Sequence, residues 1–296
     1  MQNFRSLPHF HHPEVRNLAW AVGSVPLLHD PDNNTRLNLL DDEWMLDRFT
    51  RHIPWLLELD ENPVRLESFL LTEETNLVGK KFEALLKFLF SNSPWFELIA
   101  SNVQVIKDGR TIGEMDFIVF DKYSEELLHI EAACKYYYSR SGQSVWNDWW
   151  GPNHADRLDL KMEKFKAQTK LSKLPEGKLA LANLGIENPT SVVLLKGYFF
   201  YPFNALGATT RPHLAHPHHQ AGWFLNQNQL ETFKNSPQQW VILPKTHWIS
   251  GYHHENNKLP VLNGNELISE AIHSKALLIS QIQEGKEISR GLIIRD

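Results

Sequence analysis

Three charged side chains stand out by their spacing in the stretch GEMDFIVFDKYSEELLHIEAACKYYY, which runs from Gly113 to Tyr138. Asp116 lies in one strand-like segment, and Glu131 and Lys135 lie in the next. Because successive side chains of a strand point to opposite faces, Glu131 and Lys135 share a face, and pairing of the two strands would bring Asp116 close to Glu131. Two carboxylates so placed repel each other unless a positive charge lies between them.

A hard divalent cation such as Mg²⁺ suits a site built from oxygen atoms alone. A bound metal can polarise a phosphate and activate water, while a nearby lysine stabilises the negative charge of the transition state. This combination of two acids and a lysine is therefore typical of metal-assisted phosphodiester hydrolysis.

The elements that must position these residues follow from the hydrophobic pattern. In the segment 74–91, apolar residues recur at helical spacing and predict a helix with a core-facing side. Turn signals in DGR and DKYSEE separate the strand-like segments that follow, which predicts an antiparallel meander. The expected strands span 96–107, 112–121, 126–138 and 191–203, and a helix is expected over about 155–172.

The order of helix, meander, helix and strand predicts an α/β fold with a mixed sheet. Outside this core, DDEWMLDRFTRHI predicts a helix closed by Pro54, a further helix is expected near 264–284, and EISRGLIIR reads as a last strand. We divide the chain into a helical N-terminal extension packed on the core, the core itself, and a C-terminal α/β extension of the same domain. The boundaries are 1–70, 71–205 and 206–296.

A helix with Glu83, then GEMD, then HIEAACK, then a helix with Gln168, resembles the core of the PD-(D/E)XK nuclease superfamily. A closer resemblance is to an uncharacterised bacterial domain-of-unknown-function family assigned to that superfamily. It covers about residues 75–205 and rests on GEMDFIV, HIEAACKYYY, GPNHADRLDLKMEKF and LLKGYFFYPF. The resemblance implies a restriction-endonuclease-like core, in which helices flank a central mixed β-sheet, with N- and C-terminal additions.

The resemblance also implies roles for individual residues. Asp116, Glu131 and the backbone carbonyl of Ala132 would bind Mg²⁺ or Mn²⁺, Lys135 would be the catalytic lysine, and Glu83 would be an auxiliary carboxylate. The superfamily usually places its lysine two residues after the acid, where this chain has Ala133. Lys135 lies ~6–7 Å farther along the strand, although on the same face.

The predicted helix after the meander carries a polar stripe on one side. This stripe consists of Arg157, Lys161, Lys164 and Gln168, and an apolar packing face lies beside it. A nucleic-acid backbone favours such a basic stripe, although a solvated helix face has the same composition. In several branches of the superfamily a helix Gln or Lys points at the active site, which is the role that we expect for Gln168.

Composition narrows the class of protein. The chain has 296 residues and a net charge of −5, whereas pure nucleic-acid binders are usually basic; an enzyme with a local basic groove remains compatible. The single cysteine, Cys134, excludes an intrachain disulfide and fits the cytoplasm. We find no signal-peptide pattern and no apolar run of ~18 residues, so we expect a cytoplasmic protein with no membrane partner.

Several alternatives remain open. The chain can be a catalytically inactive nuclease-fold protein that binds nucleic acid or a protein partner. A glutamate and a lysine on an exposed strand face are often only members of solvated cross-strand pairs, and Glu83 can form an ordinary helix pair with Lys87. Cys134 is expected to face the core, away from Glu131, so a cysteine hydrolase is rejected.

Two further groups of residues suggest weaker hypotheses. A zinc site could form in the histidine-rich loop, since zinc is often bound by closely spaced histidines. The histidines concerned are His213, His216, His218 and His219, with His253 and His254 farther along. Aromatic residues of the loop after the meander could stack on unpaired bases, or could simply pack the domain. They are Tyr138, Trp146, Trp149 and Trp150.

Overall fold

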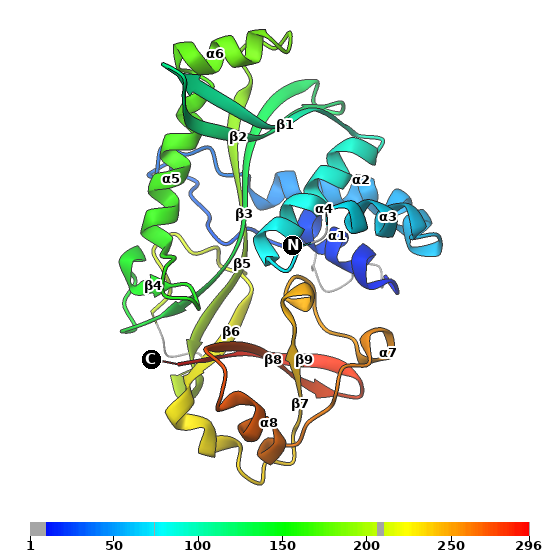
Figure 1. Ribbon diagram of the computed structural model, residues 1–296, viewed down its shortest axis with the longest axis vertical. Helices are drawn as coiled ribbons and strands as arrows, with labels where there is room; N and C mark the ends of the chain where they lie inside the picture. Colours follow the sequence, from blue (N-terminus) through cyan, green and yellow to red (C-terminus); the bar gives the residue numbers. More distant parts are fainter. Residues whose placement is uncertain (1–9, 74, 206–209, 296) are drawn as a thin grey trace.

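A single mixed β-sheet extends through the molecule in the computed structural model, which describes residues 10–73, 75–205 and 210–295 (Figure 1). Within these ranges the sheet has nine strands, in the order β1-β2-β3-β5-β6-β9-β8-β7, and β4 pairs with β3. Helices flank the sheet. The predicted α/β class with a central mixed sheet is confirmed.

The first three strands form the predicted antiparallel meander. They are β1 (Phe96–Lys107), β2 (Arg110–Asp121) and β3 (Glu126–Ser139). Asp108 and Gly109, which connect β1 to β2, both have positive φ angles, 48° and 73°. Two such residues form the tight turn that suits a two-residue hairpin, so the DGR signal is confirmed.

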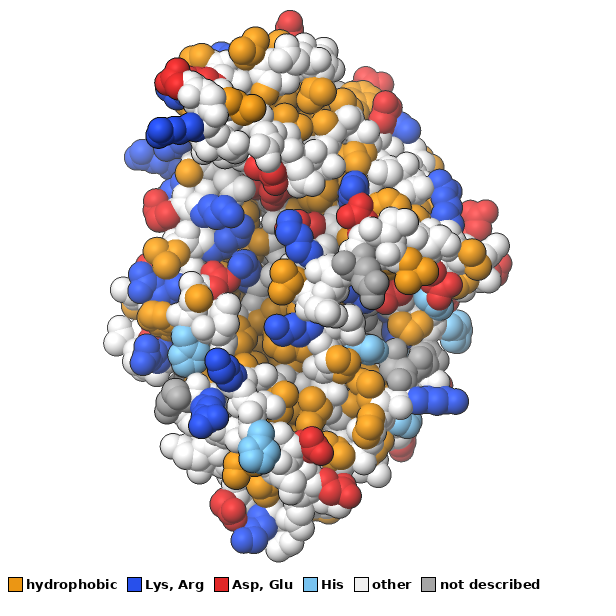
Figure 2. Space-filling view, viewed as in Figure 1, with side chains coloured by type: hydrophobic (Ala, Val, Ile, Leu, Met, Phe, Trp, Pro, Cys, Tyr) orange, Lys and Arg blue, Asp and Glu red, His pale blue; other side chains and the backbone are white. Residues whose placement is uncertain are grey.

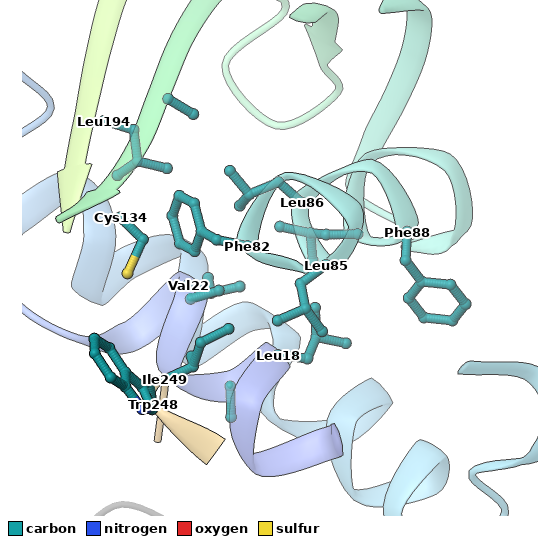
Figure 3. Packing of buried hydrophobic residues seen from close by; sticks show 14 of the residues in the cluster. Leu18, Val22, Phe82, Leu85, Leu86, Phe88, Cys134, Leu194, Trp248 and Ile249 are labelled. Atoms are coloured by element: carbon teal, nitrogen blue, oxygen red, sulfur yellow. The ribbon is translucent and has the colours of Figure 1, made fainter. Parts of the chain in front are cut away.

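Strand β5 (Thr190–Pro202) lies parallel to β3 and completes the centre of the sheet. Four helices cover one face of this centre: α1 (Pro13–Gly23), α2 (Asp42–Glu61), α3 (Val64–Thr72) and α4 (Val78–Asn92). The apolar side of α4 packs with α1 against the sheet, and Cys134 and Leu194 lie in the same cluster (Figure 3). Cys134 therefore faces the core, as predicted. Residue 74, the first of the expected helix 74–91, lies outside the described residues.

The opposite face of the sheet is covered by α5 (Leu158–Leu171), and α6 (Pro175–Ala182) packs against β1. Leu158, Met162 and Phe165 of α5 are buried against β3 and β5 residues such as Ala133 and Val193. This is the packing face predicted from the helical spacing. Figure 1 shows α5 on one side of β3 and α4 on the other.

The C-terminal strands join the same sheet beyond β5. They are β6 (Ala221–Asn226), β7 (Gln239–Leu243), β8 (Ala276–Gln283) and β9 (Lys286–Ile294), with α7 (His254–Asn257) and α8 (Gly264–Ala271) in the connections. The short β4 (Trp149–Trp150) lies in the predicted aromatic loop. The last strand was predicted correctly as EISRGLIIR.

Two predicted helix boundaries are wrong. The helix expected near 264–284 ends at Ala271, and β8 follows, because its apolar residues pack on both faces: Leu278 lies in one core cluster and Ile279 in another. Pro54 does not close its helix, since α2 continues to Glu61 with Pro54 inside. Pro54 is exposed, so the backbone carbonyl that loses its partner there can bind water.

No helix in the described ranges is both long and apolar enough to cross a membrane.

Candidate active site

Strands β2 and β3 separate at Asp116 and Glu131. Their pairing runs from Asp121 opposite Glu126 to Phe117 opposite Ile130 and goes no further. The next pair in this register would be Asp116 and Glu131, and the backbone N–H of Asp116 lies 3.4 Å from Glu131 Oε1. The two acids predicted to lie together do so, at a fork in the sheet, which we call the β2–β3 fork.

The backbone of Ala132 also faces the β2–β3 fork. Its N–H donates a hydrogen bond to Asp116 Oδ2 at 3.0 Å. Because the N–H and C=O of one strand residue point toward the same neighbouring strand, the Ala132 carbonyl projects into the fork as well. Asp116 Oδ2 and Glu131 Oε1 thus each contact a backbone N–H of the opposite strand at the fork, and the role of the Ala132 carbonyl as a metal ligand stays a prediction.

The two carboxyl groups are held where ionisation is unfavourable. Glu131 is fully buried, and burial raises its pKa to about 7. Burial, followed by the neighbouring charge of Glu131, raises the pKa of Asp116 to about 7. Glu131 Oε2 has no hydrogen-bond partner among the described residues. Ionising both acids in this space requires a compensating cation.

His129 supports Glu131 from the same strand, a role that we did not predict. Its Nε2 lies 2.8 Å from Glu131 Oε1, and its Nδ1 lies 3.0 Å from Ser191 Oγ on β5. Burial lowers the pKa of His129 to about 4, so the ring is neutral. The neutral ring can then donate from Nε2 to Glu131 and accept the Ser191 hydroxyl at Nδ1, while Ser172 Oγ lies 2.9 Å from Ser191 Oγ.

The sequence could predict that His129 lies beside Glu131, but it could not predict the contact with Ser191. His129 lies two residues before Glu131, hence on the same strand face. Ser191 is 62 residues away from His129, and only the parallel pairing of β3 with β5 brings it into contact.

Lys161 of α5 is a lysine whose charge acts on both carboxylates of the fork. Its charge lowers the pKa values of both Asp116 and Glu131, partly opposing the effect of burial. Burial, followed by the charges of Lys135 and Lys164, lowers the pKa of Lys161 itself to about 8. Its Nζ lies 3.9 Å from the ring centre of Phe165.

Lys135, the lysine predicted to be catalytic, forms an ion pair outside the carboxylate pair. Its Nζ lies 2.5 Å from Asp156 Oδ2, in the loop before α5. Its charge nevertheless contributes to lowering the pKa of Lys161, so the two amines share one region of positive charge. The catalytic role of Lys135 stays a prediction.

Glu83 approaches the β2–β3 fork from α4. Its charge is one of those that raise the pKa of Asp116. It forms an ion pair with Lys80 at 2.6 Å, whereas Lys87 pairs with Glu73 at 2.6 Å. The alternative pair of Glu83 with Lys87 is therefore not the one observed.

The polar stripe of α5 is divided between two environments. Arg157 binds the carboxylate of Asp159 with two nitrogens, at 2.6 and 2.8 Å. Lys164 contributes to lowering the pKa of Glu131, and Gln168 Oε1 is buried with no hydrogen-bond partner in the described part of the chain. Lys161 and Lys164 thus act on the carboxylates, while Arg157 is held locally.

The aromatic loop mainly packs the domain. Trp149 is fully buried, and Trp146 and Trp150 are half-buried. Trp149 Nε1 donates to the Gln143 carbonyl at 3.0 Å and Trp146 Nε1 to the His213 carbonyl at 2.7 Å. These contacts favour the packing interpretation over base stacking.

One group of three possible metal ligands occurs among the described residues, and it includes a single member of the histidine-rich loop. Ligand atoms of His29, Asp42 and His216 all lie within 4.8 Å of one another. His216 Nδ1 accepts the backbone N–H of His218 at 3.0 Å, so the ring proton sits on Nε2, 3.3 Å from Asp42 Oδ2. This protonation opposes metal binding at Nε2 and favours a hydrogen bond with Asp42.

Comparison with known proteins gives the family. Residues 16–294 match the family described as a domain of unknown function (DUF1853), and the chain belongs to that family. No curated protein and no solved structure matches the chain.

Proposed function

We propose that this member of the DUF1853 family is a metal-dependent nuclease that hydrolyses phosphodiester bonds of DNA or RNA at the β2–β3 fork. The observation that carries the proposal is the pair of opposed carboxyl groups of partly buried Asp116 and fully buried Glu131, with pKa values raised to about 7. Among the described residues, one glutamate oxygen, Oε2, has no hydrogen-bond partner. Such perturbed acids cluster at functional sites far more than at structural ones.

The donor atoms at the fork fit a hard cation. Asp116, Glu131 and the Ala132 carbonyl offer oxygens only, which is the preference of Mg²⁺ and Mn²⁺. A bound cation would supply Lewis acidity toward a phosphate and lower the pKa of a bound water. It would also relieve the repulsion between the two acids.

Side chains of the protein orient the carboxylate of Glu131 and place a lysine beside the two acids. His129 holds Oε1 of Glu131 through a neutral ring, while Oε2 has no hydrogen-bond partner among the described residues and is available to a cation. Lys161, with a pKa lowered to about 8, can hold or release a proton near neutral pH beside the carboxylates. We assign to Lys161 the charge-stabilising role that a lysine at position 133 would have in the PD-(D/E)XK superfamily.

The arrangement of elements supports a restriction-endonuclease-like core. Helix α4 precedes the β1–β3 meander, α5 covers the opposite face, and β5 returns parallel to β3. The acids lie on β2 and β3, and α4 and α5 contribute Glu83 and Lys161 from opposite faces. This is the order that the resemblance implies for the catalytic residues.

A nuclease assay tests the proposal. Purified protein is incubated with single- and double-stranded DNA and RNA in Mg²⁺, in Mn²⁺ or in EDTA. We expect cutting that requires the metal and is abolished by Asp116→Asn and by Glu131→Gln. Glu97→Gln, which changes an exposed acid on β1, is the matched control and should cut normally.

A catalytically inactive binding protein is the second candidate. It is favoured by Ala133 at the usual lysine position and by the ion pair that holds Lys135 on Asp156. Nucleic-acid binding without cutting, on all four substrates and with either metal, would support this candidate and contradict hydrolysis.

A further inference from the structure

A polar pocket lies on the α5 side of the sheet, between α5 and the loop 33–38. Its volume is about 740 Å³, within the range of about 300–1,000 Å³ that is typical of ligand pockets. Four cationic side chains line it: Arg36, Lys166, Lys170 and Lys173. Its described lining contains no carboxylate, so the pocket is suited to an anion.

The concentration of positive charge is local. The chain as a whole carries a net charge of −5, so the cations of this pocket do not reflect a basic composition. Lys166 has a partner, Glu163, at 2.8 Å. Arg36, Lys170 and Lys173 form no ion pair with any residue that the structure describes. Like charges gathered without counter-charges create a field that attracts anions.

The loop wall of the pocket is already ordered. The Asp30 carboxylate accepts the backbone N–H groups of Asn34 and Thr35 at 2.8 and 2.7 Å. The backbone of Val193 on β5 donates to the Asn38 carbonyl at 2.9 Å, which fixes the other end of the loop. An anion therefore meets a preformed wall and does not need to order it, which favours affinity.

A chain of hydrogen bonds links the pocket to the β2–β3 fork. Ser191 lies in its lining and bonds His129, which bonds Glu131. Helix α5 contributes Lys166 and Lys170 to the pocket and the turn after it contributes Lys173, while Lys161 and Lys164 of α5 lower the pKa of Glu131. Figure 2 shows lysine and arginine side chains gathered over the region where α5 lies. At 100° per residue, the lysines of the pocket and those near the fork lie on opposite sides of α5, and exposed Leu160, Glu163 and Ala167 lie between them.

We infer that this pocket binds phosphate groups, and specifically those of a nucleic-acid backbone that passes over α5. A polymer is favoured over a small anion because a backbone that crosses α5 would meet cations on both sides of the helix: Lys166 and Lys170 at the pocket, and Lys161 and Lys164 at the fork. The inference deepens the proposed function, since it rests on a nucleic-acid ligand, but it does not require the acids at the fork to cut. Binding is therefore measured separately from cleavage.

The experiment measures binding of fluorescent single- and double-stranded oligonucleotides in EDTA, where no metal-dependent cutting occurs. The variant Arg36→Gln/Lys170→Gln/Lys173→Gln is compared with Arg295→Gln/Lys245→Gln/Lys275→Gln, which removes the same charge from exposed positions in the C-terminal part. We expect at least tenfold weaker binding for the pocket variant and less than a twofold change for the control. The slope of log K against log salt should also fall by about 0.9 for each lost contact with double-stranded DNA.

Calorimetric titration with inorganic phosphate distinguishes free phosphate from nucleic-acid phosphates as the ligand of the pocket. If the pocket variant loses phosphate binding but keeps oligonucleotide affinity, the ligand is free phosphate and the inference is overturned. Equal loss in both variants, or no binding by the natural chain, overturns it too. Glu97→Gln, which changes an exposed acid on β1, should bind oligonucleotides normally. Binding through the pocket without any cutting by the natural chain would refute only the proposed hydrolysis. Circular dichroism confirms that each variant is folded.

Discussion

The neutral ring of His129 lies with its Nε2 2.8 Å from Glu131 Oε1, and both side chains are fully buried at the β2–β3 fork. This contact fixes one oxygen of the glutamate, whereas the other has no hydrogen-bond partner in the part of the chain that the structure describes. A carboxylate held in this way behaves as an oriented ligand, because partners behind a ligand set its direction and basicity.

The first prediction concerns His129→Ala. Loss of the ring removes the closer of the two partners of Oε1 and leaves only the Asp116 N–H at 3.4 Å, so Glu131 is held less firmly. Mn²⁺ affinity should fall about 10–100-fold, as is usual when such a partner is lost. Metal titration by calorimetry measures the change. His129→Asn, which retains a side-chain donor, should recover part of the affinity. Equal affinity in the alanine variant and the natural chain would show that the ring only fills space.

The second prediction concerns stability and pH. The pKa of Asp116 is about 7 in the folded protein, above its ordinary value of 3.8. Between these values the folded state binds more protons than the unfolded state, so this group lowers stability as pH rises through the window, with the full penalty above pH 7. Asp116→Asn removes the penalty and should raise Tm at pH 8 in EDTA, by about 2–4 °C for each kcal/mol relieved.

The gain from Asp116→Asn should shrink as pH falls toward 4, because the folded side chain is then protonated and the unfolded one is about half protonated, so the difference in bound protons is nearly lost. Thermal unfolding at pH 8, 6 and 4 gives the comparison, with Glu97→Gln as the control for loss of an exposed charge. A gain that is independent of pH would mean that burial and repulsion do not raise this pKa.

The third prediction concerns metal binding in the absence of any substrate. Mg²⁺ or Mn²⁺ should raise Tm at pH 8, since a ligand that binds only the folded state stabilises it. The increase should be lost in Glu131→Gln and should be smaller at pH 5, where protons compete for the carboxylates. The double change His29→Ala/His216→Ala tests the other group of possible ligands and should leave the effect intact.

The sequence predicted the parts of the fold that depend on local patterns. Periodicity located α4, the meander and α5, and strand alternation placed Asp116 beside Glu131 and turned Cys134 to the core. The failures came from tertiary context. Both faces of β8 are buried, which hides the alternation that marks a strand, and the exposed position of Pro54 lets α2 continue through it.

The site was predictable where residues share an element and unpredictable where elements meet. Helical spacing put Lys161 on a polar stripe, but only the packing of α5 over the sheet brings its charge to Asp116 and Glu131. The ion pair of Lys135 with Asp156 depends on the path of the loop before α5, which no periodicity describes. The same holds for Ser191, which reaches His129 through the pairing of β3 with β5.

The last prediction separates the two lysines. Lys161 is partly buried beside the carboxylates, whereas Lys135 is held by Asp156. If the protein cuts nucleic acid, Lys161→Met should reduce kcat by ~10²–10³, the usual cost of removing one preorganised stabilising group. Lys135→Met should reduce kcat less than tenfold, because the main partner of Lys135 is Asp156, which lies outside the pair of acids. Single-turnover cleavage with saturating metal measures both rates.

The pH profile gives an independent readout for the same lysine. If Lys161 stabilises the transition state as a cation, activity should fall as pH rises through about 8, where its amine loses the proton. Lys161→Arg keeps the charge at all accessible pH values, so it should abolish this alkaline decline while retaining part of the activity. The assignment fails if Lys135→Met is the more damaging change, since the strand lysine would then reach the phosphate after leaving Asp156.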